Sequence, residues 1–294
     1  MEKIYCFGEL LWDMLPSGKQ AGGAPMNVAY HLNRLGLEAK PITAIGKDTL
    51  GKELVEFLIS KNISTDFVLE NAQPTGQVVV TLSKSNEASY SIQAPAAWDF
   101  IELNKETLIE IAGKEYILIF GSLACRNSIN RDTLNRLATK ASLKICDINL
   151  RSPFYNKDLV HHLFSITDWI KINHEELALI TAWYRDDLNT EEKQARFLLN
   201  TFPDVDLVLV TRGANGAAYY DRETSCEHTG FKVKVADTVG SGDSFLAMFI
   251  SKALEGVDPV ECLKYSCAMG AVVASHAGAT PAFDIDAEIN KLLN

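Results

Sequence analysis

The sequence predicts an α/β fold, a mainly parallel sheet with helices on both faces and a small β-sheet appendage. Short runs of β-branched and aromatic residues alternate with longer stretches of helical period, as they do where helices join parallel strands. The chain has 294 residues, more than one compact core usually needs and fewer than two full-sized domains need. We therefore expect a single domain, 1–294, with the extra length in the appendage.

The alternation predicts a definite order of elements. Compact apolar runs predict strands at 3–7, 116–120, 144–148, 168–172 and 206–211. Helical period predicts helices at 24–36, 48–61, 128–142, 156–165, 190–202, 241–255 and 259–276. This order favours a doubly wound sheet over a barrel.

One segment departs from this alternation. Residues 75–82 are rich in β-branched residues, a polar turn follows at 83–88, and 89–93 reads as a second strand, which is the pattern of an antiparallel hairpin. A hairpin between βα units does not easily join a parallel sheet, so we expect about 11–21 and 75–97 to form the appendage. Such a piece suits a lid over an active site. An edge hairpin or a dimer contact is the alternative.

Composition and charge limit the classes of function. The 28 Lys and Arg side chains against 38 Asp and Glu give a net charge of −10, so neither nucleic acid nor an anionic membrane is an expected partner. Any anionic ligand must be held locally. No apolar stretch is long enough to span a bilayer, which favours a cytoplasmic protein. The six cysteines lack metal-binding or Cys-x-x-Cys spacing and are expected to be reduced packing residues.

The strongest functional signal is the turn Asp-Thr-Val-Gly-Ser-Gly-Asp at 237–243, followed directly by apolar residues at helical spacing. The backbone N–H groups of Gly240, Ser241 and Gly242, with the helix dipole, suit a phosphate or a developing oxyanion. Asp243 lies in the first helical turn, where it could orient or deprotonate a hydroxyl that attacks a phosphate. Helix capping by Asp243 is an equal alternative.

A second glycine loop, Thr-Arg-Gly-Ala-Asn-Gly at 211–216, follows an apolar strand. Ligands of open α/β sheets bind at the carboxyl ends of strands, and Gly213 and Gly216 would let nucleotide phosphates approach the backbone. Taken by itself, the loop is better explained as a plain hairpin into 217–220.

The segment before the first predicted helix suits a polyol. Gly22 and Gly23 allow a ligand to meet the backbone, and Asn27 offers both a donor and acceptors to hydroxyls. Asp13 could accept hydrogen bonds from two neighbouring hydroxyls, with a turn-forming role as the alternative.

Two polar sets, 147–151 and 173–176, end predicted strands and therefore lie at the same ligand edge. Asn173 and Glu176 could hold Mg²⁺, directly or through its waters. Taken alone, an Asn173 helix cap completed by Glu176 explains them better. His174 and the pair at 161–162 lack metal partners at recognisable spacing and are expected at the surface.

One nucleotide-binding class is rejected, and a second, the Rossmann dehydrogenase, is disfavoured. Residues 46–53 nearly match a P-loop, but Glu53 stands where P-loops place a hydroxyl on magnesium. The first predicted strand is followed by Gly8 and Glu9, without the Gly-x-Gly-x-x-Gly turn that a Rossmann dehydrogenase needs.

Together the motifs resemble the ribokinase-like (PfkB) family of carbohydrate kinases over essentially the whole chain. The segment 22–29, with Gly36 and Gly46 behind it, resembles the family's N-terminal signature, and 237–243 its C-terminal one. Residues 173–176 resemble its magnesium-associated motif, and 211–216 its nucleotide loop. The resemblance implies a ribokinase-like, Rossmann-like α/β fold with a β-sheet lid and phosphoryl transfer from ATP to a sugar hydroxyl.

The resemblance also implies a role for each candidate residue. Asp243 would act as base, the backbone of 240–243 as anion hole, and the lid would exclude water. The nucleotide would contact Asn173, Thr211, Gly213, Gly216, Gly240 and Gly242, and Mg²⁺ would be organised by Glu176 and Asn173. The sugar would contact Asp13, Gly22, Gly23, Asn27, Arg151 and Asp243. K⁺ is implied at the loops around Asp237 and Gly278.

Within the family, the segments 7–13, 22–25 and 147–153 look most like fructokinases, which predicts D-fructose as substrate and fructose 6-phosphate as product. Residues 93–100 depart from the usual fructokinase sequence, so ribose, 2-keto-3-deoxygluconate and nucleosides remain alternative substrates. Trp98 or Phe100 could line the sugar pocket, with packing as the alternative. A noncatalytic sugar- or nucleotide-binding protein is the other class, and pairing of lid hairpins would allow a homodimer.

Overall fold

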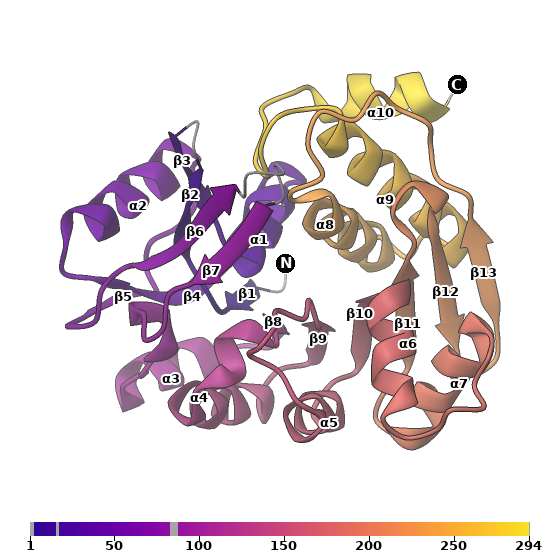
Figure 1. The fold of residues 1–294 in the computed structure, drawn as a ribbon, viewed down its shortest axis with the longest axis horizontal. Coiled ribbons are helices and arrows are strands. Elements are labelled where there is room, and N and C mark those ends of the chain that lie inside the picture. The colour runs from indigo at the N-terminus through magenta and orange to yellow at the C-terminus, as the bar shows by residue number, and fades with distance from the viewer. Residues whose placement is uncertain (1–2, 16–17, 83–87, 294) are drawn as a thin grey trace.

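The computed structural model describes residues 3–15, 18–82 and 88–293, whose strands form a large and a small sheet (Figure 1). The large sheet contains β1 (Lys3–Phe7), β4 (Ala39–Gly46), β5 (Val68–Asn71), β8 (Tyr116–Gly121), β9 (Leu143–Asp147), β10 (Trp169–Asn173), β11 (Leu207–Thr211), β12 (Ala217–Asp221) and β13 (Ser225–His228). Their order is β13-β12-β11-β10-β9-β8-β1-β4-β5. The seven neighbouring strands from β11 through β1 to β5 in this order pair in parallel, and β12 and β13 are antiparallel at one edge. The predicted mainly parallel sheet is confirmed.

The predicted helices are all present, with ends that differ by a few residues. They are α1 (Ala24–Arg34), α2 (Thr49–Ser60), α4 (Ser128–Ala138), α5 (Lys157–Ser165), α7 (Glu191–Thr201), α8 (Ser241–Leu254) and α9 (Pro259–Ala274). The sequence did not predict strands β4, β5 and β13, or helices α3 (Lys105–Ala112), α6 (His174–Ala182) and α10 (Ile285–Leu293).

Local features explain two of these omissions. Pro41 lies inside β4, and a proline inside a run argues against a ladder strand, yet it pairs in parallel register with Cys6. Helix α6 begins with no connecting loop, because Asn173 is both the last residue of β10 and the cap of the helix. Because no polar loop separates the strand from the helix, the sequence pattern did not show α6 as a separate element.

Helices cover both faces of the large sheet, as predicted. On β1, Tyr5 and Phe7 pack in a buried cluster with residues of α3 to α7. Ile4 and Cys6 point to the opposite face, where they pack with α1, α8 and α9. Because side chains alternate along a strand, this strand is buried on both faces.

The small sheet contains β2 (Leu11–Leu15), β3 (Gly18–Gly22), β6 (Gly76–Leu82) and β7 (Ala88–Ile92), in the order β3-β2-β6-β7. It lies beside α2, in the left half of the view in Figure 1. β6 and β7 form the predicted antiparallel hairpin, and β2 pairs in parallel with β6. The sequence thus predicted the two segments that form this sheet, although 16–17 and the turn at 83–87 lie outside the described residues.

Residues 93–100, the segment that departs from the usual fructokinase sequence, pack against the core. Trp98 is fully buried, and the guanidinium of Arg126 lies 4.0 Å from its ring centroid and 4.4 Å from that of Phe154. Arg126 Nε and Nη2 each donate to a different oxygen of Asp99 at 2.7 Å, and Nη2 also donates to the Gln93 carbonyl. The packing alternative for Trp98 is confirmed, and Arg126 ties the end of β7 to the main domain.

Other sequence expectations agree with the fold. All six cysteines are free thiols, and all but Cys226 are buried. Within the described residues, no helix has both the length and the apolar character needed to cross a bilayer.

Candidate active site

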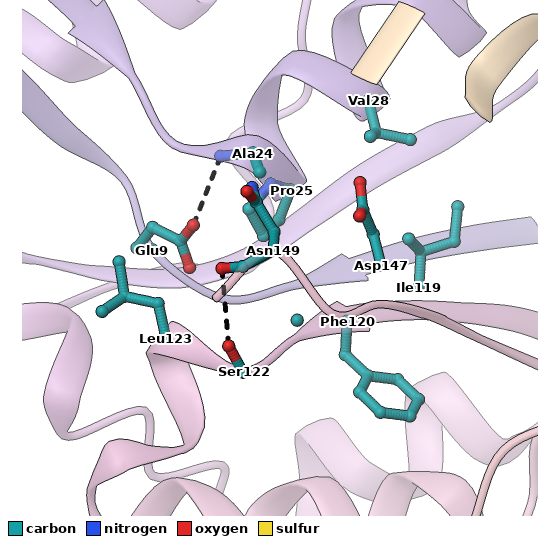
Figure 2. Close-up of a pocket in the computed structure, with 11 residues that line it drawn as sticks. Glu9, Ala24, Pro25, Val28, Ile119, Phe120, Ser122, Leu123, Asp147 and Asn149 are labelled. Carbon is teal, nitrogen blue, oxygen red and sulfur yellow. Dashed lines mark hydrogen bonds between the residues drawn. The ribbon is translucent and has the colours of Figure 1, made fainter. Parts of the chain in front are cut away.

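A pocket lies where the strand order of the large sheet reverses. β1 lies between β4 and β8, so the chain leaves it in one direction and later returns on the other side, which is where open α/β sheets bind ligands. The pocket is lined by the residues that follow β1, by the ends of β8 and β9, and by the start of α1 (Figure 2). Glu9, Ser122, Asp147 and Asn149 provide its polar lining.

The predicted anion hole is the opening turn of α8. Gly240 precedes the helix with a φ of 78°, a left-handed conformation that favours glycine, and a methyl group on it would lie 2.7 Å from the Ala279 Cα. The first N–H groups of a helix have no acceptor within it, so those of Gly242 and Asp243 are available to an anion. His31 of α1 bonds to the Ala279 carbonyl at 2.9 Å and so supports this turn.

The Asp243 side chain is buried and held by α1. Asn27 Nδ2 donates to Asp243 Oδ2 at 2.8 Å. Burial, reinforced by the negative charge of Asp147, raises the pKa of Asp243 to about 6, while the positive charges of Lys171 and Arg151 oppose this rise. Among the described residues, the side-chain hydrogen bond of Asp243 comes from Asn27, and α8 has no side-chain cap. The role of Asp243 as base stays a prediction.

The other predicted sugar residues on the small sheet, Asp13 and Gly22, lie against each other. In the small sheet, Asp13 Oδ2 would lie 2.5 Å from a methyl group on Gly22, so the carboxylate lies directly against that backbone. Burial raises the pKa of Asp13 to about 6, against the positive charge of Arg151. Arg151 is exposed, and its charge acts on both Asp13 and Asp243. Gly23 has a φ of 120°, and a methyl group on it would lie 2.2 Å from the Glu9 carbonyl oxygen.

The two predicted nucleotide loops lie side by side, because Asn173 and Thr211 are paired in the register of β10 and β11. Asn173 caps α6, and Glu176 completes the capping box, so the structural interpretation of this pair is confirmed. The loop after Thr211 is also a hairpin, into β12. Within it Gly213 is exposed, whereas Gly216 packs against His228 of β13.

A family model for the pfkB family of carbohydrate kinases matches residues 7–286. The chain belongs to this family. The match covers nearly the whole chain and contains every candidate site residue, so the predicted family resemblance is confirmed. The protein is therefore a carbohydrate kinase of the pfkB family.

Individual relatives are more distant. The fructokinase of Solanum tuberosum is 27% identical over 315 residues, which cover 99% of this chain and 95% of that protein. The fold is similar to that of a fructokinase from Xylella fastidiosa with bound ATP, with a TM-score of 0.85, 24% identity and coverage of 99% and 98% of the two chains. A double mutant of the fructokinase from Vibrio cholerae O395, with fructose, ADP and a potassium ion bound, gives a TM-score of 0.83, 22% identity and coverage of 100% and 99%.

The pfkB site has limited means to bind a metal directly. Glu176 Oε1 accepts from the Leu150 N–H at 2.7 Å and Oε2 from the Asn173 N–H at 3.0 Å. Among the described residues, no cluster of three or more His, Cys, Asp or Glu side chains could hold a metal ion. The arrangement fits a Mg²⁺ carried by nucleotide phosphates and waters, with Glu176 and Asn173 as outer partners.

The loops with the predicted K⁺ role are brought together. The Gly278 N–H donates to Asp237 Oδ2 at 3.1 Å, and the Val239 N–H donates to Asp237 Oδ1 at 3.0 Å. The N–H groups of Ala236 and Asp237 donate to the Ala274 carbonyl. A cation role for these loops stays a prediction.

Sequence reasoning missed two residues of this site. Glu9 is buried, its Oε1 accepts from the Ala24 N–H at 3.3 Å, and burial raises its pKa. Lys171 is buried in β10, where burial opposes its charge but Asp147 keeps its pKa above the ordinary value. The available signals were a carboxylate just after a buried strand and a single lysine inside the apolar run 169–172.

Proposed function

We propose that this pfkB kinase transfers the γ-phosphoryl group of ATP to the 6-hydroxyl of D-fructose. The observation that carries the proposal is the buried Asp243 carboxylate, with its pKa raised to about 6, next to the N–H groups that open α8. A base near neutral pKa beside an anion hole is what phosphoryl transfer to an alcohol requires. Fructose is favoured because the relatives reported above are named fructokinases.

In this mechanism Asp243 accepts the proton of the attacking hydroxyl, and Asn27 fixes the orientation of its carboxylate. The backbone N–H groups of 240–243 stabilise negative charge on the transferring phosphoryl group. Asp13 and the backbone of Gly22 and Gly23 bind the sugar hydroxyls, and Arg151 contacts the sugar or the phosphoryl group.

The nucleotide is assigned to the edge formed by β10 and β11. Asn173, Thr211, Gly213 and Gly216 would contact ATP, with Gly240 and Gly242 nearest its terminal phosphate. When Mg²⁺ is bound with ATP, it neutralises phosphate charge, and Glu176 and Asn173 would hold its waters.

The small sheet would act as the lid. It carries Asp13 on β2 and joins the main domain near Gln93, so its movement would carry a sugar-binding carboxylate toward the site. Closure would exclude water, which competes with the sugar for the phosphoryl group. The outer strands β3 and β7 offer edges for a homodimer, and both the dimer and a cytoplasmic location stay predictions.

A sugar panel in a coupled ADP-release assay tests the substrate. D-fructose should give the highest kcat/KM, and omission of Mg²⁺ should abolish turnover. Turnover with ribose, 2-keto-3-deoxygluconate or a nucleoside but not with fructose would replace the substrate assignment. Absence of ADP release with every sugar would favour the noncatalytic binding protein.

The raised pKa of Asp243 predicts an acid limb in the pH profile. A general base works only when deprotonated, so kcat/KM should fall as pH drops through about 6. Asp13 has a similar pKa of about 6, so the limb could belong to either carboxylate. Initial rates from pH 5 to 8 should show the same acid limb for Asp13→Asn as for the wild type, and the sugar KM of the variant should be higher. A limb that disappears in Asp13→Asn would assign it to Asp13 instead.

A further inference from the structure

A buried ion pair lies beneath the proposed anion hole. Lys171 Nζ is 2.9 Å from both carboxylate oxygens of Asp147, and only 10% and 6% of the two side chains are exposed. Asp147 lines the pocket at the end of β9 (Figure 2). A buried pair of this kind is weak evidence for stability, because apolar replacements of similar volume are often neutral or stabilising. Its location at the site needs another explanation.

The ammonium of Lys171 packs on the backbone of the anion hole. A methyl group placed on Gly242 would lie 2.9 Å from Lys171 Nζ and 3.7 Å from its Cε. The lysine therefore fills the space beneath the turn whose N–H groups open α8. An ammonium has three donors, and among the described residues the hydrogen bonds of Nζ go to the two oxygens of Asp147.

The two charges of the pair act in opposite directions on the site. The positive charge of Lys171 favours the ionised form of Asp243, and the negative charge of Asp147 disfavours it. Lys171 is thus a fixed cation beside the proposed base and beneath the Gly242 turn, where negative charge accumulates during phosphoryl transfer.

We propose that Lys171 is a positioning residue for phosphoryl transfer, which supports the Gly242 turn from below and balances the negative charge that enters the site. Asp147 holds the ammonium in place. Lys171 forms no covalent bond in this step: the γ-phosphorus–oxygen bond to ADP breaks, a bond to the sugar oxygen forms, and the hydroxyl proton goes to Asp243. The proposal rests on the proposed phosphoryl transfer, but not on fructose as the acceptor.

The test compares Lys171→Met, Asp147→Asn and the double variant, each with the sugar that the wild type phosphorylates best. The double variant removes both charges together and should melt within a few degrees of the wild type, because neither partner is left unpaired. Its kcat should fall about tenfold to hundredfold, less than the roughly 10²- to 10³-fold loss for a donor that contacts the oxyanion directly, because Lys171 acts from beneath the turn. The sugar KM should change less than threefold.

The single variants should also shift the acid limb of kcat/KM in opposite directions. The charged and polar groups that face Asp243 are Asp147, Lys171, Asn27, Arg151 and Glu9. Asp147→Asn removes a negative neighbour and should move the limb to lower pH. Lys171→Met removes the cation and should move it to higher pH. A purely structural role would not produce opposite shifts.

Lys144→Met is the matched control. Lys144, near the amino-terminal end of the neighbouring strand β9, also pairs with an aspartate, Asp168, at 2.8 Å. Asp147 is at the opposite end of the same strand. Lys144→Met should lose an ion pair without a change in kcat. A stable double variant with kcat within threefold of the wild type, or single variants with unshifted limbs, would overturn the role of Lys171. A wild type that phosphorylates no sugar would instead contradict the proposed function.

Discussion

Asp243→Asn should lower kcat by about two orders of magnitude or more, the range expected when a positioned general base is removed. Asparagine keeps the size of the side chain and can still bond to Asn27, but it cannot accept the hydroxyl proton. Steady-state ADP release with saturating sugar and ATP measures the effect, and calorimetric titration with ADP should show unchanged nucleotide binding. Near-normal turnover would remove Asp243 from its role as base.

The same variant should not lose stability. The pKa of Asp243 rises from 3.8 to about 6 on folding, so the native state binds its proton more tightly than the unfolded chain. The free energy of unfolding contributed by this group is therefore largest below pH 3.8 and decreases as pH rises through about 6. Above that pH, Asp243→Asn removes a buried charge and should melt at or above the wild-type temperature. A much lower melting temperature would attribute the lost activity to misfolding.

Arg126→Met should cost about 3–5 kcal/mol of unfolding free energy, the usual result of leaving one partner of a buried ion pair. Its guanidinium is bonded to both oxygens of Asp99 and packed between the rings of Trp98 and Phe154. Removal leaves the Asp99 carboxylate buried and frees the Gln93 carbonyl at the end of the small sheet. Urea denaturation at neutral pH measures the loss.

Two further variants separate the causes of that loss. Arg126→Met combined with Asp99→Asn should recover much of the stability, because no unpaired charge remains. Arg185→Met removes an exposed arginine whose partner is Asp187 and should leave the urea midpoint unchanged. If Arg126→Met unfolds at the same urea concentration as the wild type, the stabilising role assigned to this ion pair is wrong.

The framework of the fold was predictable because its signals are local. The apolar runs of β1, β8 and β11 and the periodic helices such as α8 each carry their own pattern. β4 escaped prediction because Pro41 interrupts it, and α6 because Asn173 serves two elements at once. The bounds of both elements depend on how β4 and β10 pair with neighbouring strands, and a single sequence does not show this pairing.

The candidate site was predictable to a similar degree. The glycine turns and the Asp243 motif can be recognised in the sequence, because few residues other than glycine let a ligand approach the backbone where a helix begins. Lys171 and Asp147 come from different strands, and only the register of β9 and β10 brings them together beneath Gly242. The role of Trp98 could not be predicted, because an aromatic residue in the sequence can either line a pocket or pack in the core, and only the structure shows that it is buried.

Phosphorus NMR of a reaction containing wild-type chain, MgATP and D-fructose tests the central claim most directly. We expect the γ-phosphate resonance of ATP to decrease while ADP and fructose 6-phosphate appear in equal amounts, and Asp243→Asn to form neither product over the same period. Formation of inorganic phosphate alone, phosphorylation at another hydroxyl, or no change in the ATP signal would contradict it.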